Sequence, residues 1–160
     1  MSDARWADVS ASAESATKHF RSSLELYEMG GFDAPGLDGY RASMAIMHSM
    51  HAAHTSAEAA LKRVLDILGE ERPSREDWHE TLINRLASSL TGAHMRPAVL
   101  PRELAAALHM TRQFRHVAAH AYDRFDASRA TPAIHAAAYV AEHLLPAIDR
   151  FKAVVDPEPA

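Results

Sequence analysis

The 160-residue chain contains no cysteine, which excludes a disulfide framework, a catalytic thiolate and any zinc site built on cysteine. Glycine is scarce, with six residues, and this argues against a fold rich in loops. Alternating runs of Val, Ile and Thr bounded by turn residues are also missing, so we expect no strand of useful length. Good helix formers such as Ala, Leu, Arg, Glu and Met dominate the middle of the chain. The sequence therefore predicts an all-α fold.

Features of secretion and of membrane insertion are lacking as well. The N-terminal residues, MSDARWADVS, contain no basic head followed by an apolar run, so no usual secretory signal is expected. The longest uncharged stretch, residues 42–55, contains three histidines and is too short and too polar to span a bilayer. We therefore expect a cytoplasmic protein without a membrane partner.

The net charge of −4 argues against a surface that coats nucleic acid non-specifically. The charge is unevenly spread, because residues 96–129 hold six arginines against three acidic residues, which gives +3 there and −7 in the remainder. Such a zone is compatible with one phosphate-binding site, and equally with a solvated face. The arginines are Arg96, Arg102, Arg112, Arg115, Arg124 and Arg129.

Apolar residues spaced by three and four predict five helices joined by short links, which is typical of a helical bundle. The first two are expected over residues 5–29 and 37–68. A third should follow a cap at Ser74, a fourth should have Pro101 at its first position, and the last should begin at a Thr131-Pro132 cap. We predict a single domain over residues 1–155 and a disordered tail over residues 156–160.

The predicted second helix has two apolar stripes. One runs from Ile46 to Ile67, and the other runs from Tyr40 to Leu68. A helix that is apolar on two faces has two surfaces to pack against, so we expect one of them to meet a partner subunit in a homodimer.

The candidate chemistry lies late in the chain, where Arg115, His120 and Tyr122 spell R-x-x-x-x-H-x-Y. Histidine can accept or donate a proton near neutral pH, and arginine offers a charged planar fork to phosphate, so the pair is suited to phosphate binding and proton transfer. A spacing of five residues puts the two about 140° apart around an ideal helix. Either the helix ends near His120, as Asp123 and Asp126 would suit, or a second protomer completes the site.

This segment resembles the HepT-like ribonuclease toxins of the HEPN superfamily, whose motif has an Arg, a polar residue, three variable residues, a His and then a Tyr two residues later. The polar residue is His116 here. The likeness covers residues 43–155 and includes EDWHETLINRLA, RPAVLP and FRHVAAHAY. It implies a HEPN-like bundle of about five helices, a homodimer with the two motifs facing across a twofold axis, and cofactor-free RNA cleavage by Arg115 and His120.

The resemblance also implies supporting and regulatory roles. His116 and Arg112 would support the catalytic pair. In type VII toxin–antitoxin pairs of this family, a minimal nucleotidyltransferase partner adenylylates the motif tyrosine, here Tyr122. Tyr122 would then silence the enzyme when modified, or contact RNA when it is not.

Two rows of histidines, His109/His116/His120 and His48/His51/His54, have the spacing of metal ligands but lack a complete ligand set. Ligands from a single helix cannot close a tetrahedron around zinc, so we expect no metal site. His51, His54 and Glu58 share one face of the predicted second helix, and we consider them candidates for the lining of the cleft.

Two alternatives to a ribonuclease stay open at this point. HEPN domains also occur as inactive modules that bind nucleotides or scaffold a neighbouring nucleotidyltransferase. The motif can also arise by accident in an unrelated helical bundle.

Overall fold

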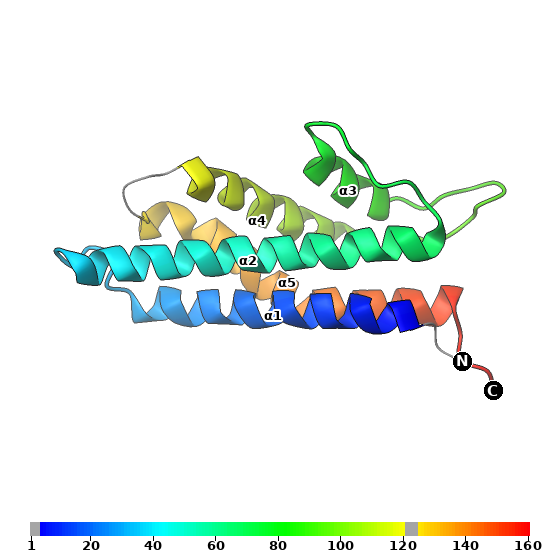
Figure 1. The fold of residues 1–160 in the computed structure, drawn as a ribbon, viewed down its shortest axis with the longest axis horizontal. Helices are drawn as coiled ribbons and strands as arrows, with labels where there is room; N and C mark the ends of the chain where they lie inside the picture. Colours follow the sequence, from blue (N-terminus) through cyan, green and yellow to red (C-terminus); the bar gives the residue numbers. More distant parts are fainter. Residues whose placement is uncertain (1–3, 121–124) are drawn as a thin grey trace.

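The computed structural model describes residues 4–120 and 125–160, without the side chains of residues 116–120. The described residues form five helices, and their single β-feature is an isolated bridge between Leu90 and Arg96. The predicted all-α architecture is therefore confirmed for this part of the chain (Figure 1). The helices are α1 (Ala4–Met29), α2 (Leu37–Leu68), α3 (Trp78–Leu86), α4 (Arg102–His120) and α5 (Ala127–Val155).

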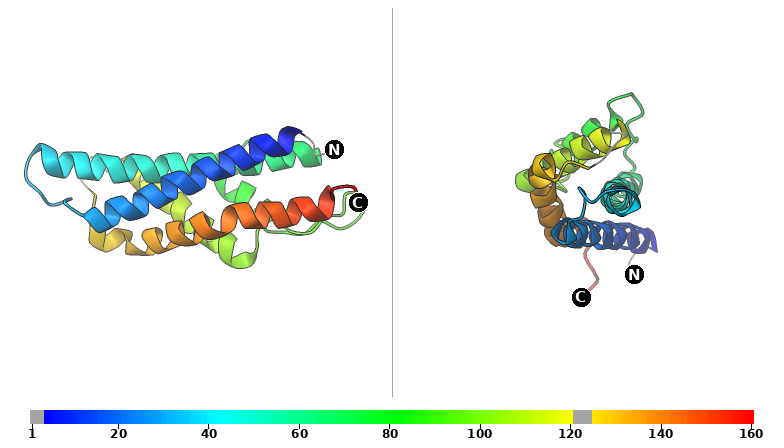
Figure 2. Two further views of the ribbon diagram at one scale, coloured as in Figure 1. Left: turned by 90° about the horizontal axis from the view of Figure 1, so that it is seen from below. Right: turned by 90° about the vertical axis from the view of Figure 1, so that its left-hand side faces the viewer.

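The two long N-terminal helices form the base of the bundle. α1 and α2 lie side by side and antiparallel, and α5 packs against α1 (Figures 1 and 2). α4 packs against α5 and α2, while α3 packs against α4 and α2. The two ends of the chain meet, because Trp6 Nε1 donates a hydrogen bond to Asp156 Oδ2 at 3.0 Å. None of the described helices combines the length and the apolar character needed to cross a bilayer.

Glycines end the first two helices, as the sequence predicts. Gly30 has a φ of 65° and donates its N–H to the carbonyl of Leu26 at 3.2 Å, which terminates α1. Gly69 has a φ of 69° and donates to the carbonyl of Asp66, which terminates α2. Both positions need a left-handed backbone that glycine adopts without strain.

The predicted starts of the last three helices are wrong by one to four residues. Residues 75–78 form a turn closed by Trp78 N–H and Arg75 C=O, so α3 begins after Asp77 rather than after Ser74. Pro101 precedes α4, and its carbonyl accepts the first helical bond, from Ala105. α5 begins four residues before Thr131, because the Asp126 side chain caps it by accepting from Ser128 N–H at 3.0 Å.

The stripes predicted for α1 and α2 form the core. Trp6, Val9, Ala13, Ala16 and Phe20 of α1 are buried. They face α2, whose first stripe is buried from Ile46 to Val64.

The second stripe of α2 does not need a partner subunit, which corrects the reason given for one in the sequence analysis. Met47, Leu61 and Leu65 are buried by α3 and α4 of the same chain, whereas Tyr40 is exposed. The homodimer itself stays a prediction.

An aromatic cluster fixes the start of α5 against the rest of the bundle. The ring of Phe125 is buried and lies 4.6 Å from that of Phe32, between α1 and α2, and 5.9 Å from that of Phe114 in α4. Both pairs are edge-to-face, which is a favourable aromatic geometry. The backbone is not helical at Phe125 and Asp126, so α4 and α5 are separate helices.

Candidate functional site

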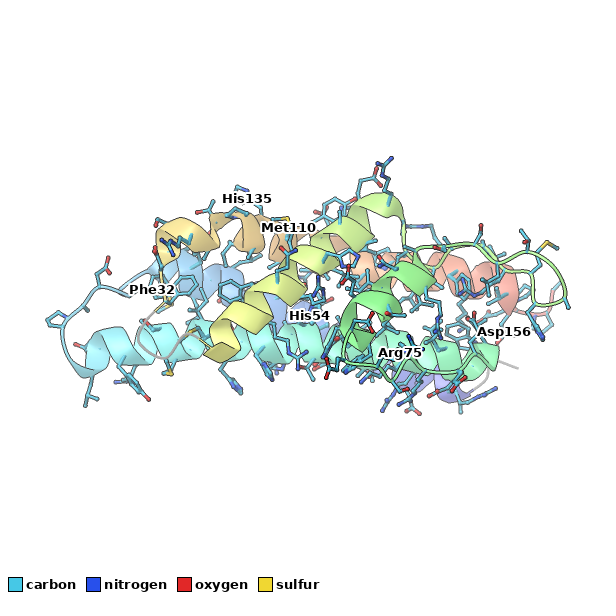
Figure 3. The ribbon with its side chains drawn as sticks, turned by 90° about the horizontal axis from the view of Figure 1, so that it is seen from above. Phe32, His54, Arg75, Met110, His135 and Asp156 are labelled. Carbon is cyan, nitrogen blue, oxygen red and sulfur yellow. The ribbon has the colours of Figure 1, made fainter. Side chains whose placement is uncertain are left out.

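A polar cluster lies where α3 and α4 cover α2. Figure 3 looks down on α4 and α3, with His54 of α2 labelled between them. This polar cluster consists of six residues from these three helices. They are His51, His54 and Glu58 of α2, His79 of α3, and Thr111 and Arg115 of α4.

Glu58 is the centre of the polar cluster and is 2% exposed. Its Oε1 accepts a hydrogen bond from Arg115 Nη1 at 3.0 Å, and its Oε2 accepts from His79 Nδ1. His54 Nε2 lies 3.6 Å from Oε2, somewhat beyond hydrogen-bond distance. A buried carboxylate is costly unless it is paired and hydrogen-bonded, and here donors from two other helices supply that pairing.

Arg115 connects the cluster to the accessible surface. Its side chain is 24% exposed, and its Nε donates to His51 Nδ1 at 3.4 Å. Nη1 binds Glu58 and lies 3.2 Å from His79 Nδ1, while Nη2 has no hydrogen-bond partner among the described side chains. The guanidinium is therefore held in place on one side and offers a charged edge on the other.

A hydrogen bond joins His54 to α4. His54 Nδ1 donates to Thr111 Oγ1 at 2.9 Å, because the hydroxyl proton of Thr111 is donated to the carbonyl oxygen of Leu108 at 3.1 Å. Nε2 lies 3.6 Å from Glu58 Oε2 and has no hydrogen-bond partner among the described atoms. The bond to Thr111 ties α2 to α4 one turn before Arg115 and helps to set the position of that residue.

The surroundings shift the pKa of three groups of the site. Burial, and then the charge of Arg115, lowers the pKa of His51, and burial lowers the pKa of His54. For Glu58, burial acts to raise the pKa, but the nearby imidazoles of His54 and His79 outweigh it and leave the pKa below its ordinary value. The Glu58 carboxylate is therefore charged at neutral pH, and the neutral form of His51 and of His54 is favoured.

The structure brings together several residues that the sequence named as candidates. His51, His54 and Glu58 lie beside Arg115, so the candidates for the cleft lining and the motif arginine share one site. The backbone of His116 and of His120 belongs to α4, but their side chains lie outside the described part, as does the whole of Tyr122.

Other members of the arginine-rich zone lie elsewhere. Arg96 is buried and binds Glu70 at 2.9 Å, so it supports the loop before α4. Arg112 makes no bond to the polar cluster, and its buried Nε has no partner among the described atoms. Within the same helix, His109 Nε2 donates to Asn84 Oδ1 of α3 at 2.9 Å, outside the polar cluster.

His79 is the site residue that the sequence analysis missed. Nothing in the local sequence DWHETL distinguishes it from an ordinary surface histidine of a short helix. The available signal was indirect: Glu58 falls within an apolar stripe, so it had to find buried donors on helices packed over α2. Its aromatic neighbour is also informative, because Trp78 stacks on His79 with ring centroids 3.5 Å apart.

Among the residues that the structure describes, no group of three or more His, Asp or Glu side chains is arranged to hold a metal ion. The arrangement offers instead a fixed guanidinium, suited to a phosphate oxygen, and imidazole rings, suited to proton transfer.

Comparison with known proteins supports the resemblance seen in the sequence. A family model described as HepT-like protein matches residues 45–155, which is more than half of the chain. The match includes the whole of the polar cluster and the R-x-x-x-x-H-x-Y motif. No curated protein and no solved structure matches the chain.

Proposed function

The chain belongs to the HepT-like family of the HEPN superfamily, and we propose that it is a ribonuclease toxin that cleaves RNA with Arg115 and His120. The family generally consists of ribonucleases, and the intact motif favours an active member. Membership removes the interpretation of an accidental motif in an unrelated bundle.

The chemistry is the attack of a ribose 2′-hydroxyl on the adjacent phosphate. Arg115 binds the phosphate and stabilises the charge that develops on it, and His120 takes part in the transfer of protons. The reaction needs no metal, because arginine supplies the positive charge and histidine titrates near neutral pH.

The observation that carries this proposal is the fixed guanidinium of Arg115. Glu58 and His51 bind two of its nitrogens, and its side chain keeps 24% of its surface exposed. A cation that is held by buried partners does not have to reorganise when phosphate binds, and such preorganisation is what makes electrostatic catalysis effective.

We further propose that the enzyme is a homodimer whose two motifs share one cleft, and that a minimal nucleotidyltransferase silences it by adenylylation of Tyr122. An AMP group would add bulk and negative charge close to Arg115. On a continuing helix Tyr122 would point away from His120, so an AMP group can reach the cleft only if α4 ends near His120. The non-helical backbone at Phe125 and the cap at Asp126 support this.

The experiment is incubation of the purified protein with total RNA, alongside Arg115→Ala and His120→Ala. We expect the wild type to cleave RNA and each variant to lose activity by on the order of 10²-fold or more. Arg102→Ala is the matched control, because Arg102 is an exposed arginine in the first turn of the same helix. Equal cleavage by wild type and Arg115→Ala would contradict the assignment.

One observation favours the alternative of an inactive module that scaffolds or binds a nucleotidyltransferase. Glu58 already pairs with Arg115, so a phosphate must share the guanidinium with a buried carboxylate. A module of this kind would leave RNA intact under all conditions while still binding its partner. The same incubation separates the two functions.

A further inference from the structure

The proposed function names one residue for proton transfer, His120, although two proton transfers are needed. Cleavage by a 2′-hydroxyl needs a base at the attacking oxygen and an acid at the leaving oxygen. Building on the proposed ribonuclease function, we propose that His79 of α3 is the general base, oriented by Glu58 and acting on a phosphodiester held by Arg115.

The contact with Glu58 determines which nitrogen of His79 is free. Glu58 Oε2 accepts from Nδ1, so Nδ1 carries the proton of the neutral ring. Nε2 is then the basic nitrogen, and it makes no hydrogen bond to any described side chain. A carboxylate that accepts from one ring nitrogen keeps the proton on that nitrogen and leaves the other nitrogen free to accept a proton.

His79 also lies beside Arg115. Arg115 Nη1 lies 3.2 Å from His79 Nδ1, and both nitrogens point at Glu58. Since both groups are donors, they converge on the carboxylate rather than bond to each other. A phosphate bound to the free edge of Arg115 therefore lies next to the His79 ring, within the same chain.

The ring of His79 is also fixed in place and accessible. Trp78 stacks on it at 3.5 Å between centroids, and Lys62 Nζ of α2 lies 3.9 Å from the centroid of Trp78. The His79 side chain is 28% exposed, whereas Glu58 beneath it is buried. An oriented but accessible ring above a buried carboxylate is suited to meet a substrate hydroxyl.

The charged and titratable groups around His79 come from two other helices. Glu58 and His54 belong to α2, and Arg115 belongs to α4. When the His79 ring accepts a proton, its positive charge lies against the Glu58 carboxylate. The same carboxylate pairs with Arg115, so the negative charge of Glu58 lies between two positive groups.

The reaction step is balanced as follows. The neutral Nε2 of His79 takes the proton of the 2′-hydroxyl while the 2′-oxygen forms a bond to phosphorus. The bond from phosphorus to the 5′-oxygen breaks, and the 5′-oxygen takes a proton from the imidazolium of His120. The products are a 2′,3′-cyclic phosphate and a free 5′-hydroxyl, with His79 protonated and His120 neutral. Exchange with water resets both rings.

The test uses His79→Asn, because an asparagine amide can donate to Glu58 from the place of Nδ1 but has no basic nitrogen at the place of Nε2. Steady-state cleavage is measured with an RNA oligonucleotide and with a ribonucleoside 3′-(4-nitrophenyl phosphate), whose leaving group departs without a proton. His109→Gln is the control, because His109 binds Asn84 outside the polar cluster and glutamine keeps a donor there. Circular dichroism establishes that each variant is folded.

We expect His79→Asn to lower kcat/KM by on the order of 10²–10⁴-fold with both substrates and to lose the acidic limb of the pH profile. His120→Ala should lose activity on RNA but recover it on the nitrophenyl ester, since an acid is not needed there. His109→Gln should match the wild type.

Two results overturn the proposal while the ribonuclease assignment stands. One is wild-type cleavage of RNA by His79→Asn, and the other is recovery of that variant on the nitrophenyl ester, which would make His79 the acid. A wild-type protein that cleaves neither substrate would instead overturn the ribonuclease function, and the role of His79 with it.

Discussion

At the scale of single residues, the buried charge of Glu58 organises the site. An unpaired carboxylate in this position would destabilise the fold by several kcal/mol. Its partners offset that cost because each donates a hydrogen bond to it, and Arg115 also brings a positive charge. Those partners, His79 and Arg115, come from helices that meet only in the folded chain. The same contacts that stabilise the carboxylate therefore fix the arginine proposed to bind phosphate.

The buried His54 should make stability fall as the solution is acidified. Burial lowers the pKa of this ring in the folded chain, so between that value and about 6.5 the unfolded chain binds the extra proton. Stability is then complete above about pH 7 and declines below it, by up to about 1.4 kcal/mol per pH unit for one proton. Urea unfolding at pH 7.5 and pH 5.5 should show a lower midpoint at the acidic pH.

Replacement of His54 by asparagine should reduce this pH dependence, because the buried titrating group is gone. His51 and His109 also have lowered pKa values, so part of the decline remains. His135→Asn is the control, since His135 is exposed on α5. If the His54 variant declines as steeply as the wild type, the burial of His54 does not control the effect.

At the scale of helices, the start of α5 is anchored against the bundle. Phe125 packs against Phe32 and Phe114, and Asp126 then caps α5. The residue that precedes the cap therefore helps to set the position of α5 relative to α4.

Truncation of the Phe125 ring should be costly. Phe125→Ala removes a buried aromatic group, and we expect a loss of about 3–5 kcal/mol in the free energy of unfolding. Phe125→Leu should lose less, because it fills most of the volume. Urea unfolding measures both. A loss below about 1 kcal/mol for the alanine variant would show that the ring is not packed as described.

The sequence predicted the helices well where local signals agree. α1 and α2 have glycines in left-handed conformation just beyond their ends and apolar residues at regular spacing, and their bounds match the expectation within one residue. The start of α5 was misjudged because Thr131-Pro132 resembles a cap, while the side chain of Asp126 caps the helix earlier. Asp126 and Thr131 are both residues that can cap a helix, and the local sequence does not show which of them caps α5.

The site was predicted in part, for a physical reason. Spacing along one helix placed His54 and Glu58 on a shared face, and the motif identified Arg115. The contact of His79 with Glu58 joins residues 21 positions apart on helices that cross, and no periodicity within a helix encodes that crossing. The polarity of a residue in an apolar stripe shows that partners exist, but the identity of those partners depends on the packing of α3 over α2.

At the scale of the whole molecule, the central question is whether two chains form one cleft. Met47, Leu61 and Leu65 of the second stripe of α2 are covered within the chain, so the burial of these residues does not require a dimer. Arg115 and His120 lie about 140° apart around an ideal helix, and this separation favours a dimer, because the Arg115 of one chain could then meet the His120 of its partner.

We expect sedimentation velocity at micromolar concentration to give a dimer. An isologous interface of that kind places the same residues of both chains beside the twofold axis. A monomer at this concentration with full ribonuclease activity would exclude a shared cleft and would leave the pairing of Arg115 with His79 in one chain as the working site.

Adenylylation should fall on Tyr122. Co-expression with a cognate nucleotidyltransferase is expected to raise the intact mass by one AMP and to abolish RNA cleavage, because the added phosphate competes for Arg115. Tyr122→Phe should keep the unmodified mass. A mass shift that persists in this variant would mean that another tyrosine, Tyr139 or Tyr40, is the acceptor.

Metal-free cleavage is tested by RNA cleavage in excess EDTA, with analysis of the new ends. Since Arg115 and histidine supply the charge and the proton transfer, we predict that the wild type cleaves at an unchanged rate and leaves a 2′,3′-cyclic phosphate or its hydrolysis product. Arg115→Ala should leave the RNA intact under the same conditions. Cleavage that EDTA abolishes and a divalent cation restores would contradict the account.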